Sequence, residues 1–114
     1  MNRKQLQNLY GYIYDSLFAG EFNKPPMVIL TRPSAECAVY TAWRLEDGRW
    51  AHEIELFIDV HENMLDVADS MVHELVHAMQ QVSGRPLNHK RYFTNTLKNK
   101  MMELMEVFGE TCSE

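Results

Sequence analysis

The fold of this chain is decided by residues 63–84, which read NMLDVADSMVHELVHAMQQVSG. Apolar residues recur there at intervals of three and four, the spacing that lets one side of an α-helix face a core. Asn63 is a suitable N-cap, with Asp66 in the first turn, and Ser83-Gly84 followed by Pro86 ends the pattern. We therefore predict one long amphipathic helix between these signals.

Three strands are predicted before this helix. A proline pair at 25–26 forces extended chain ahead of the first strand, residues 27–31. The other two strands, 36–45 and 50–59, flank Asp47-Gly48, a pair typical of the type I′ turn that joins antiparallel strands. The sequence thus favours a three-stranded antiparallel sheet.

The last of these strands alternates between apolar and polar residues. Ile54, Leu56 and Ile58 fall on one side, and Glu53, Glu55 and Phe57 fall on the other. We expect one packed and one partly wet sheet face. An exposed edge at 52–58 could hold an extended peptide by adding it as a further strand, although a purely structural strand is equally compatible.

Helices are also predicted at both ends of the chain. Residues 3–19 have helical spacing, with Asn2 and Gln5 as a capping box and Gly20 as a stop. A final helix, about 89–108, opens after Asn88 and closes at Gly109. The expected fold class is α+β, in one domain that spans residues 1–114.

Composition restricts the class of protein. The chain has 114 residues, 46% of them hydrophobic and 24% charged, which suits one globular domain. It offers no transmembrane stretch and no signal-peptide core, so an intracellular, cytoplasmic protein without a membrane partner is expected. Cys37 and Cys112 form no CxxC pair and are expected to be free thiols.

The charge pattern bears on nucleic-acid binding. A net charge of -5 argues against binding through the whole surface. Residues 83–100 nevertheless carry five basic residues and no acidic one: Arg85, Lys90, Arg91, Lys98 and Lys100. A solvated helix face explains this stretch more simply than a dedicated phosphate-binding patch.

The chemistry of the chain centres on His73-Glu74-Leu75-Val76-His77, which has the pattern H-E-x-x-H. Residues four apart lie one turn apart on a helix, so both imidazoles can bind one zinc ion. Glu74 lies beside them and can take a proton from water at the open position of the ion. A packed or solvated histidine pair on an ordinary helix is the simpler alternative.

A catalytic zinc ion usually keeps three protein ligands. The candidates for the third are His89, His52, His61, Glu103 and Glu106. His89 fits best, because it follows a chain-reversing turn and starts the next predicted helix. His52 and His61 are expected to be surface residues. Gln80 and Ser83 stand where a metzincin would need glycine and histidine.

The order of these elements resembles the SprT-like zinc metallopeptidase family. The likeness runs from Leu17-Phe18-Ala19-Gly20-Glu21 through the proline-rich chain and sheet to the H-E-x-x-H motif, and then to His89 and Phe93, a further H-x-x-x-F element. It covers about residues 3–108. The resemblance implies a zincin-like minimal domain that cleaves proteins, which in some members of the family are attached to DNA.

The mechanism expected from this motif is peptide hydrolysis. His73, His77 and His89 would hold zinc, and Glu74 would act as the general base on the attacking water. Tyr40, Arg91 or Tyr92 could stabilise the developing oxyanion. Two other functions stay open: a non-catalytic, zinc-stabilised binding module, and an antirepressor-type zincin peptidase, which a carboxylate third ligand would favour.

Overall fold

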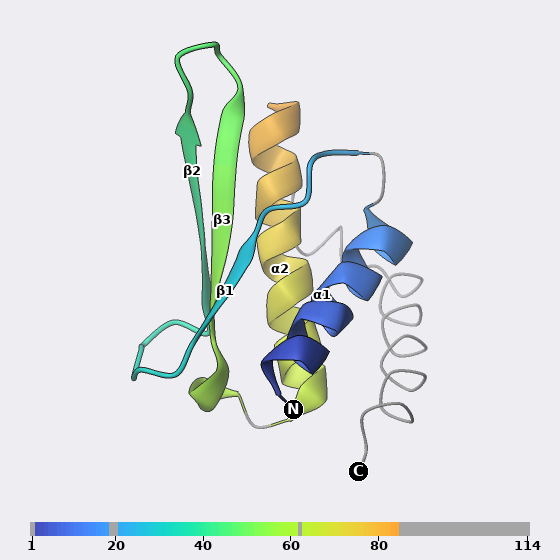
Figure 1. Cartoon of the computed structure of the whole chain (residues 1–114), viewed down its shortest axis with the longest axis vertical. Coiled ribbons are helices and arrows are strands. Elements are labelled where there is room, and N and C mark those ends of the chain that lie inside the picture. The colour runs from blue at the N-terminus through green and yellow to red at the C-terminus, as the bar shows by residue number, and fades with distance from the viewer. Residues whose placement is uncertain (1, 19–20, 62, 85–114) are drawn as a thin grey trace.

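The computed structural model describes residues 2–18, 21–61 and 63–84. Its elements follow in the order α1 (Arg3–Leu17), β1 (Met27–Leu30), β2 (Ala38–Arg44), β3 (Trp50–Phe57), the 3-10 helix η1 (Ile58–Val60) and α2 (Met64–Ser83). Both helices lie on one face of the sheet, so the domain has two layers (Figure 1). The α+β class is confirmed. The final helix predicted at 89–108 lies outside the described residues.

The sheet is mixed, which corrects the prediction of an antiparallel sheet. Its strand order is β1-β3-β2. β2 pairs with β3 in antiparallel register, whereas β1 pairs with β3 in parallel, with Met27 opposite Ile54. The physical reason is burial: no residue of β3 is exposed, and the central position satisfies the backbone groups on both of its edges. The prediction of an exposed edge at 52–58 is therefore wrong, because the edges of the sheet are β1 and β2.

The β2–β3 hairpin closes differently from the predicted type I′ turn. The backbone N–H of Leu45 donates to the carbonyl of Arg49 at 2.8 Å, which leaves three residues in the loop. The N–H of Gly48 donates to the carbonyl of Leu45, and Gly48 has a φ of 87°. This is the three-residue loop in which a turn is followed by one left-handed residue, and glycine adopts that conformation without strain.

Both helices begin at the caps expected from the sequence. Asn2 accepts from the N–H of Gln5, and the Gln5 side chain accepts from the N–H of Asn2, which completes a capping box. Asn63 accepts from the N–H of Asp66 at 3.0 Å. At its other end α2 stops at Gly84, whose φ of 71° is left-handed. Among the described residues no helix is long and apolar enough to cross a membrane.

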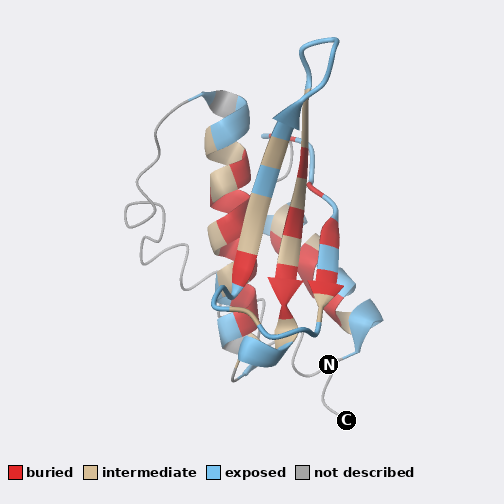
Figure 2. Cartoon of the chain, turned by 90° about the vertical axis from the view of Figure 1, so that its left-hand side faces the viewer, coloured by how far each residue is buried: buried red, intermediate tan, exposed pale blue. Residues whose placement is uncertain are grey.

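The core lies between the helices and the inner face of the sheet. Val72, Leu75 and Val76 of α2 and Ile54 and Leu56 of β3 are all 0% exposed and belong to one buried cluster. The tip of the β2–β3 hairpin extends beyond this core and is exposed (Figure 2).

α1 also closes one edge of the sheet. Its Arg3 guanidinium donates to the carbonyl of Ile29, and its Gln7 amide donates to the carbonyl of Met27 at 2.7 Å. Side chains of α1 thus form hydrogen bonds with the outward carbonyls of β1, which disfavours pairing of this edge with another chain.

Removing the Asn63 cap should weaken the helix that carries the motif. We expect Asn63→Ala to lower the free energy of unfolding by about 1 kcal/mol, because the N–H of Asp66 loses its acceptor. Urea unfolding followed by circular dichroism measures the change. Asn8→Ala is the matched control, since Asn8 is exposed in the middle of α1. An equal loss in both variants would show that the cap has no special role.

Candidate metal centre

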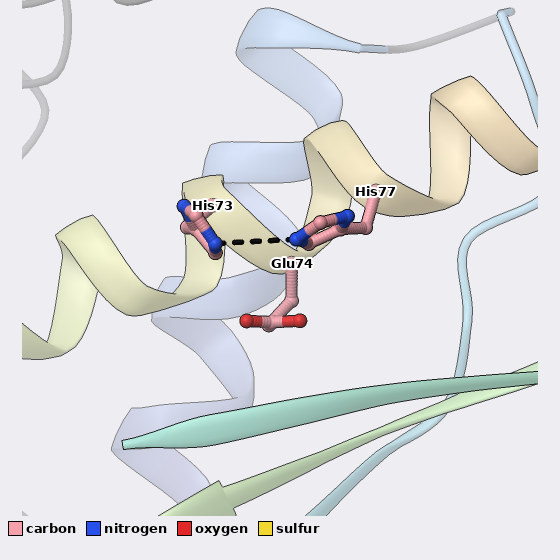
Figure 3. A group of neighbouring side chains, drawn as sticks. All are labelled: His73, Glu74 and His77. Atoms are coloured by element: carbon pink, nitrogen blue, oxygen red, sulfur yellow. Dashed lines mark hydrogen bonds between the residues drawn. The ribbon is translucent and has the colours of Figure 1, made fainter. Parts of the chain in front are cut away.

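The two histidines of the motif meet on one face of α2 (Figure 3). The Nε2 atoms of His73 and His77 lie 3.2 Å apart, and the two rings are nearly perpendicular, at 78°. With Glu74 they form a group whose potential ligand atoms all lie within 4.8 Å of one another. This group could hold a metal ion.

The neighbours of these residues explain why the imidazoles are presented in this way. The residues next to His73 and His77 in the helix face the core. Three of them are completely buried: Val72, Leu75 and Val76. Core packing therefore fixes the rotation of α2 about its axis. His73 and His77 are left half-buried at the margin of the core, where their ring nitrogens face each other.

Glu74 lies between α2 and β2 and is only 7% exposed. Burial, with a smaller effect from the nearby charge of Glu36, raises the pKa of its carboxyl to about 7, and a hydrogen bond with the Tyr40 backbone offsets part of the rise. A hydrogen bond that lowers the pKa of a carboxyl group favours the carboxylate, which only accepts, so the Tyr40 group is its N–H. A cation held by the two imidazoles would lower this pKa again, because it favours the charged form.

The Tyr40 N–H is available because of the strand register. Phe57 donates to the carbonyl of Cys37, and Leu45 donates to that of Arg49, so the odd-numbered residues of β2 exchange hydrogen bonds with β3. The backbone groups of the even-numbered residues point away from β3, toward the open edge: Ala38, Tyr40, Ala42 and Arg44. The Glu74 carboxylate therefore lies at the edge of β2.

His52 is buried at 8% exposure, so its predicted surface position is wrong. Its Nε2 lies 2.8 Å from the carbonyl of Asn23, and its Nδ1 lies 3.0 Å from the Tyr40 hydroxyl. A carbonyl only accepts, so Nε2 carries the proton and Nδ1 accepts from Tyr40. Both nitrogens are occupied, and His52 does not belong to the metal-binding group.

The same hydrogen bond bears on the role predicted for Tyr40. Burial raises the pKa of Tyr40 to about 12, so the hydroxyl keeps its proton at neutral pH. That proton is directed at His52 and not at the two imidazoles of the motif. Tyr40 therefore acts here through its backbone N–H, which sequence reasoning missed because backbone donors leave no residue-type signal.

His61 follows η1 and is half-buried, so the predicted surface position holds only in part. Its Nδ1 donates to the carbonyl of Phe57 at 2.9 Å, and its Nε2 accepts from the Ser70 hydroxyl at 2.8 Å. These bonds orient the ring toward Ser70, and His61 is not part of the metal-binding group. It links the end of β3 to the second turn of the helix that carries the motif.

The remaining candidates lie outside the described residues. This holds for the proposed third ligand His89, for Glu103 and Glu106, for Arg91 and Tyr92, and for the basic stretch from Arg85 onward. Their roles stay predictions. The one described cysteine, Cys37, is free and exposed.

The buried His52 should make stability depend on pH. Burial lowers the pKa of His52, although the hydrogen bond with the Asn23 backbone offsets part of this shift. The unfolded chain then binds a proton more readily than the folded chain once the pH falls below about 6.5. The stabilisation by neutral His52 is therefore complete above that pH and is lost as the pH falls through the folded-state pKa.

We expect the free energy of unfolding of the wild type to fall more between pH 7.5 and pH 5.5 than that of His52→Gln, since glutamine does not titrate. Urea unfolding at the two pH values measures the difference. His61→Gln is the control, because it replaces another histidine that is hydrogen-bonded to a backbone carbonyl. Parallel pH profiles for the wild type and His52→Gln would contradict this account.

Comparison with known proteins identifies no relative of this chain. No protein-family model matches it, and no curated protein or solved structure does so either.

Proposed function

We propose that this protein is a zinc-dependent endopeptidase of the SprT-like type. The observation that carries the proposal is the approach of the His73 and His77 Nε2 atoms to 3.2 Å beside the buried carboxylate of Glu74. A structural metal site needs ligands but no adjacent base. The added carboxylate therefore favours an enzyme over a binding module.

The donor set fits zinc. Two nitrogen ligands of a tetrahedral zinc ion, each at about 2.05 Å from it, lie about 3.3 Å apart. The spacing of the two Nε2 atoms differs little from this value. His89 is the proposed third ligand, which would leave the fourth position for water or substrate. When bound, zinc supplies Lewis-acid chemistry: it polarises a carbonyl oxygen and makes water more acidic.

The residues of the chain supply the remaining steps. His73 and His77 would hold the ion at the margin of the core. Glu74 accepts a proton from the attacking water on its carboxylate and passes that proton to the amine that leaves. The hydrogen bond with the Tyr40 backbone would help to hold the Glu74 carboxylate beside the sheet.

Among the described residues no strand pairs with the outer edge of β2, which supports an extended peptide as the substrate. The outward carbonyls of β1 are bound by Arg3 and Gln7, whereas the outward groups of β2 face the side on which Glu74 lies. A peptide added along β2 would form main-chain hydrogen bonds and pass beside the base. The proposed binding edge is therefore β2, in place of the 52–58 edge expected from the sequence.

Metal binding provides the first test. Purified protein should hold one equivalent of zinc, and His73→Ala and His77→Ala should each lose it, because a site with one ligand fewer is much weaker. His89→Ala should weaken zinc binding in the same way. His61→Ala is the control and should keep the metal, since its ring is bound to Phe57 and Ser70. Metal analysis and competition with a chelator measure the outcome; retention of zinc by His77→Ala would exclude this site.

Catalysis provides a separate test. Glu74→Gln should keep zinc and lower peptide cleavage by about 10²–10⁴-fold, because the amide cannot take a proton from water. The assay is cleavage of an unfolded protein, followed by mass spectrometry. Glu53→Gln, on the outer side of the sheet, is the control for the loss of one carboxylate. Undiminished cleavage by Glu74→Gln would remove Glu74 as the base.

A further inference from the structure

A pocket of about 290 Å³ lies at the hairpin end of the inner sheet face. Its walls come from three places in the chain: the segment before β1, the β2–β3 hairpin and the last turn of α2. The lining residues are Asn23, Leu45, Gly48, Arg49, Trp50, His52 and Val82. The lining does not include His73, Glu74 or His77, so the pocket is distinct from the candidate metal centre.

Two physical links connect this pocket to the candidate metal centre. His52 lines the pocket and accepts from the Tyr40 hydroxyl, and the backbone of the same Tyr40 binds Glu74. Val82 lies eight residues beyond Glu74 on α2, which is about 12 Å along the helix axis. An extended peptide covers this distance in three or four residues, at about 3.3 Å each.

The size of the pocket restricts its occupant. Sites for drug-sized ligands begin near 300 Å³, and a dry cavity of about 150 Å³ already holds a benzene ring. A volume of about 290 Å³ therefore has room for one large side chain with its backbone, but not for a cofactor. Leu45, Trp50 and Val82 provide apolar walls, which suit an aromatic side chain.

The charge beside the pocket restricts the occupant further. The guanidinium of Arg44 lies over the Trp50 ring at 4.4 Å from its centroid, and Arg49 lines the pocket while pairing with Asp47. The hairpin loop also carries two carboxylates, Glu46 and Asp47, but neither lines the pocket, whereas Arg49 does. A carboxylate next to the bound side chain would complement the two arginines.

We propose that this pocket is a specificity subsite of the peptidase, and that it takes an aromatic side chain followed by an acidic residue, three or four positions from the bond that is cleaved. This inference rests on the proposed function, because the position is counted from a bond that only a peptidase would cleave. Remote binding of this kind aligns a substrate with the reacting groups and raises the rate of cleavage.

The two tryptophans of the chain allow binding to be measured apart from cleavage. Trp50 lines the pocket, whereas Trp43 belongs to the other face of the same hairpin and is 47% exposed. In the full-length, zinc-loaded Glu74→Gln protein, Trp43→Phe leaves Trp50 as the only reporter, and Trp50→Phe leaves Trp43. Peptides that differ only in one pair, Phe-Glu, Ala-Glu or Phe-Lys, are then titrated.

The Phe-Glu peptide should change the emission of Trp50 but not of Trp43, and it should bind about tenfold more tightly than Ala-Glu. Val82→Glu should abolish this preference. Val60→Glu is the matched control, because Val60 on η1 is 37% exposed and Val82 is 40% exposed. Cleavage sites mapped with the protein that retains Glu74 should fall three or four residues from the phenylalanine.

The outcomes separate the two proposals. Equal cleavage of Phe-Glu and Ala-Glu peptides, without a response of Trp50, would overturn the subsite and leave the peptidase standing. A Phe-dependent response of Trp50 without any cleavage would keep the pocket as a peptide site and overturn the enzyme. Val60→Glu acting like Val82→Glu would attribute the effect to charge alone, and the subsite would be rejected.

Discussion

The packing of α2 against β3 is the constraint on which the rest of the structure depends. Val72, Leu75 and Val76 share one buried cluster with Ile54 and Leu56, and none of these side chains is exposed. A helix packed so tightly has one rotation about its axis. That rotation places the two imidazoles at the margin of the core and the carboxylate of Glu74 against the sheet, so the metal-binding group is a consequence of core packing.

Burying polar groups beside this core is costly unless they are hydrogen-bonded. Within the described part of the chain, no buried side-chain nitrogen or oxygen lacks a partner. Glu74 obtains its partner from the Tyr40 backbone, and the Tyr40 side chain in turn is held by His52, which binds Asn23. The edge of β2, Glu74 and the segment before β1 are thereby linked through a single set of hydrogen bonds.

Local signals in the sequence predicted the parts of the fold that are decided locally. The capping box at Asn2, the cap at Asn63 and the stop at Gly84 each depend on residues within one turn, and each is confirmed. The parallel pairing of β1 was missed because strand order depends on contacts between distant residues. His52 was placed on the surface, although it continues the alternation of Ile54 and Leu56; a stricter use of that period would have buried it.

The two edges of the sheet show why a site can form on one side only. Arg3 and Gln7 of α1 cover the edge of β1 and donate to its outward carbonyls, which disfavours pairing with another strand. β2 directs alternate backbone groups outward, and one of them already binds the carboxylate of Glu74. An exposed edge invites aggregation and is usually blunted. Among the described residues, one edge is covered and the other lies beside two histidines and a buried carboxylate, an arrangement that suits the proposed cleavage of extended chains.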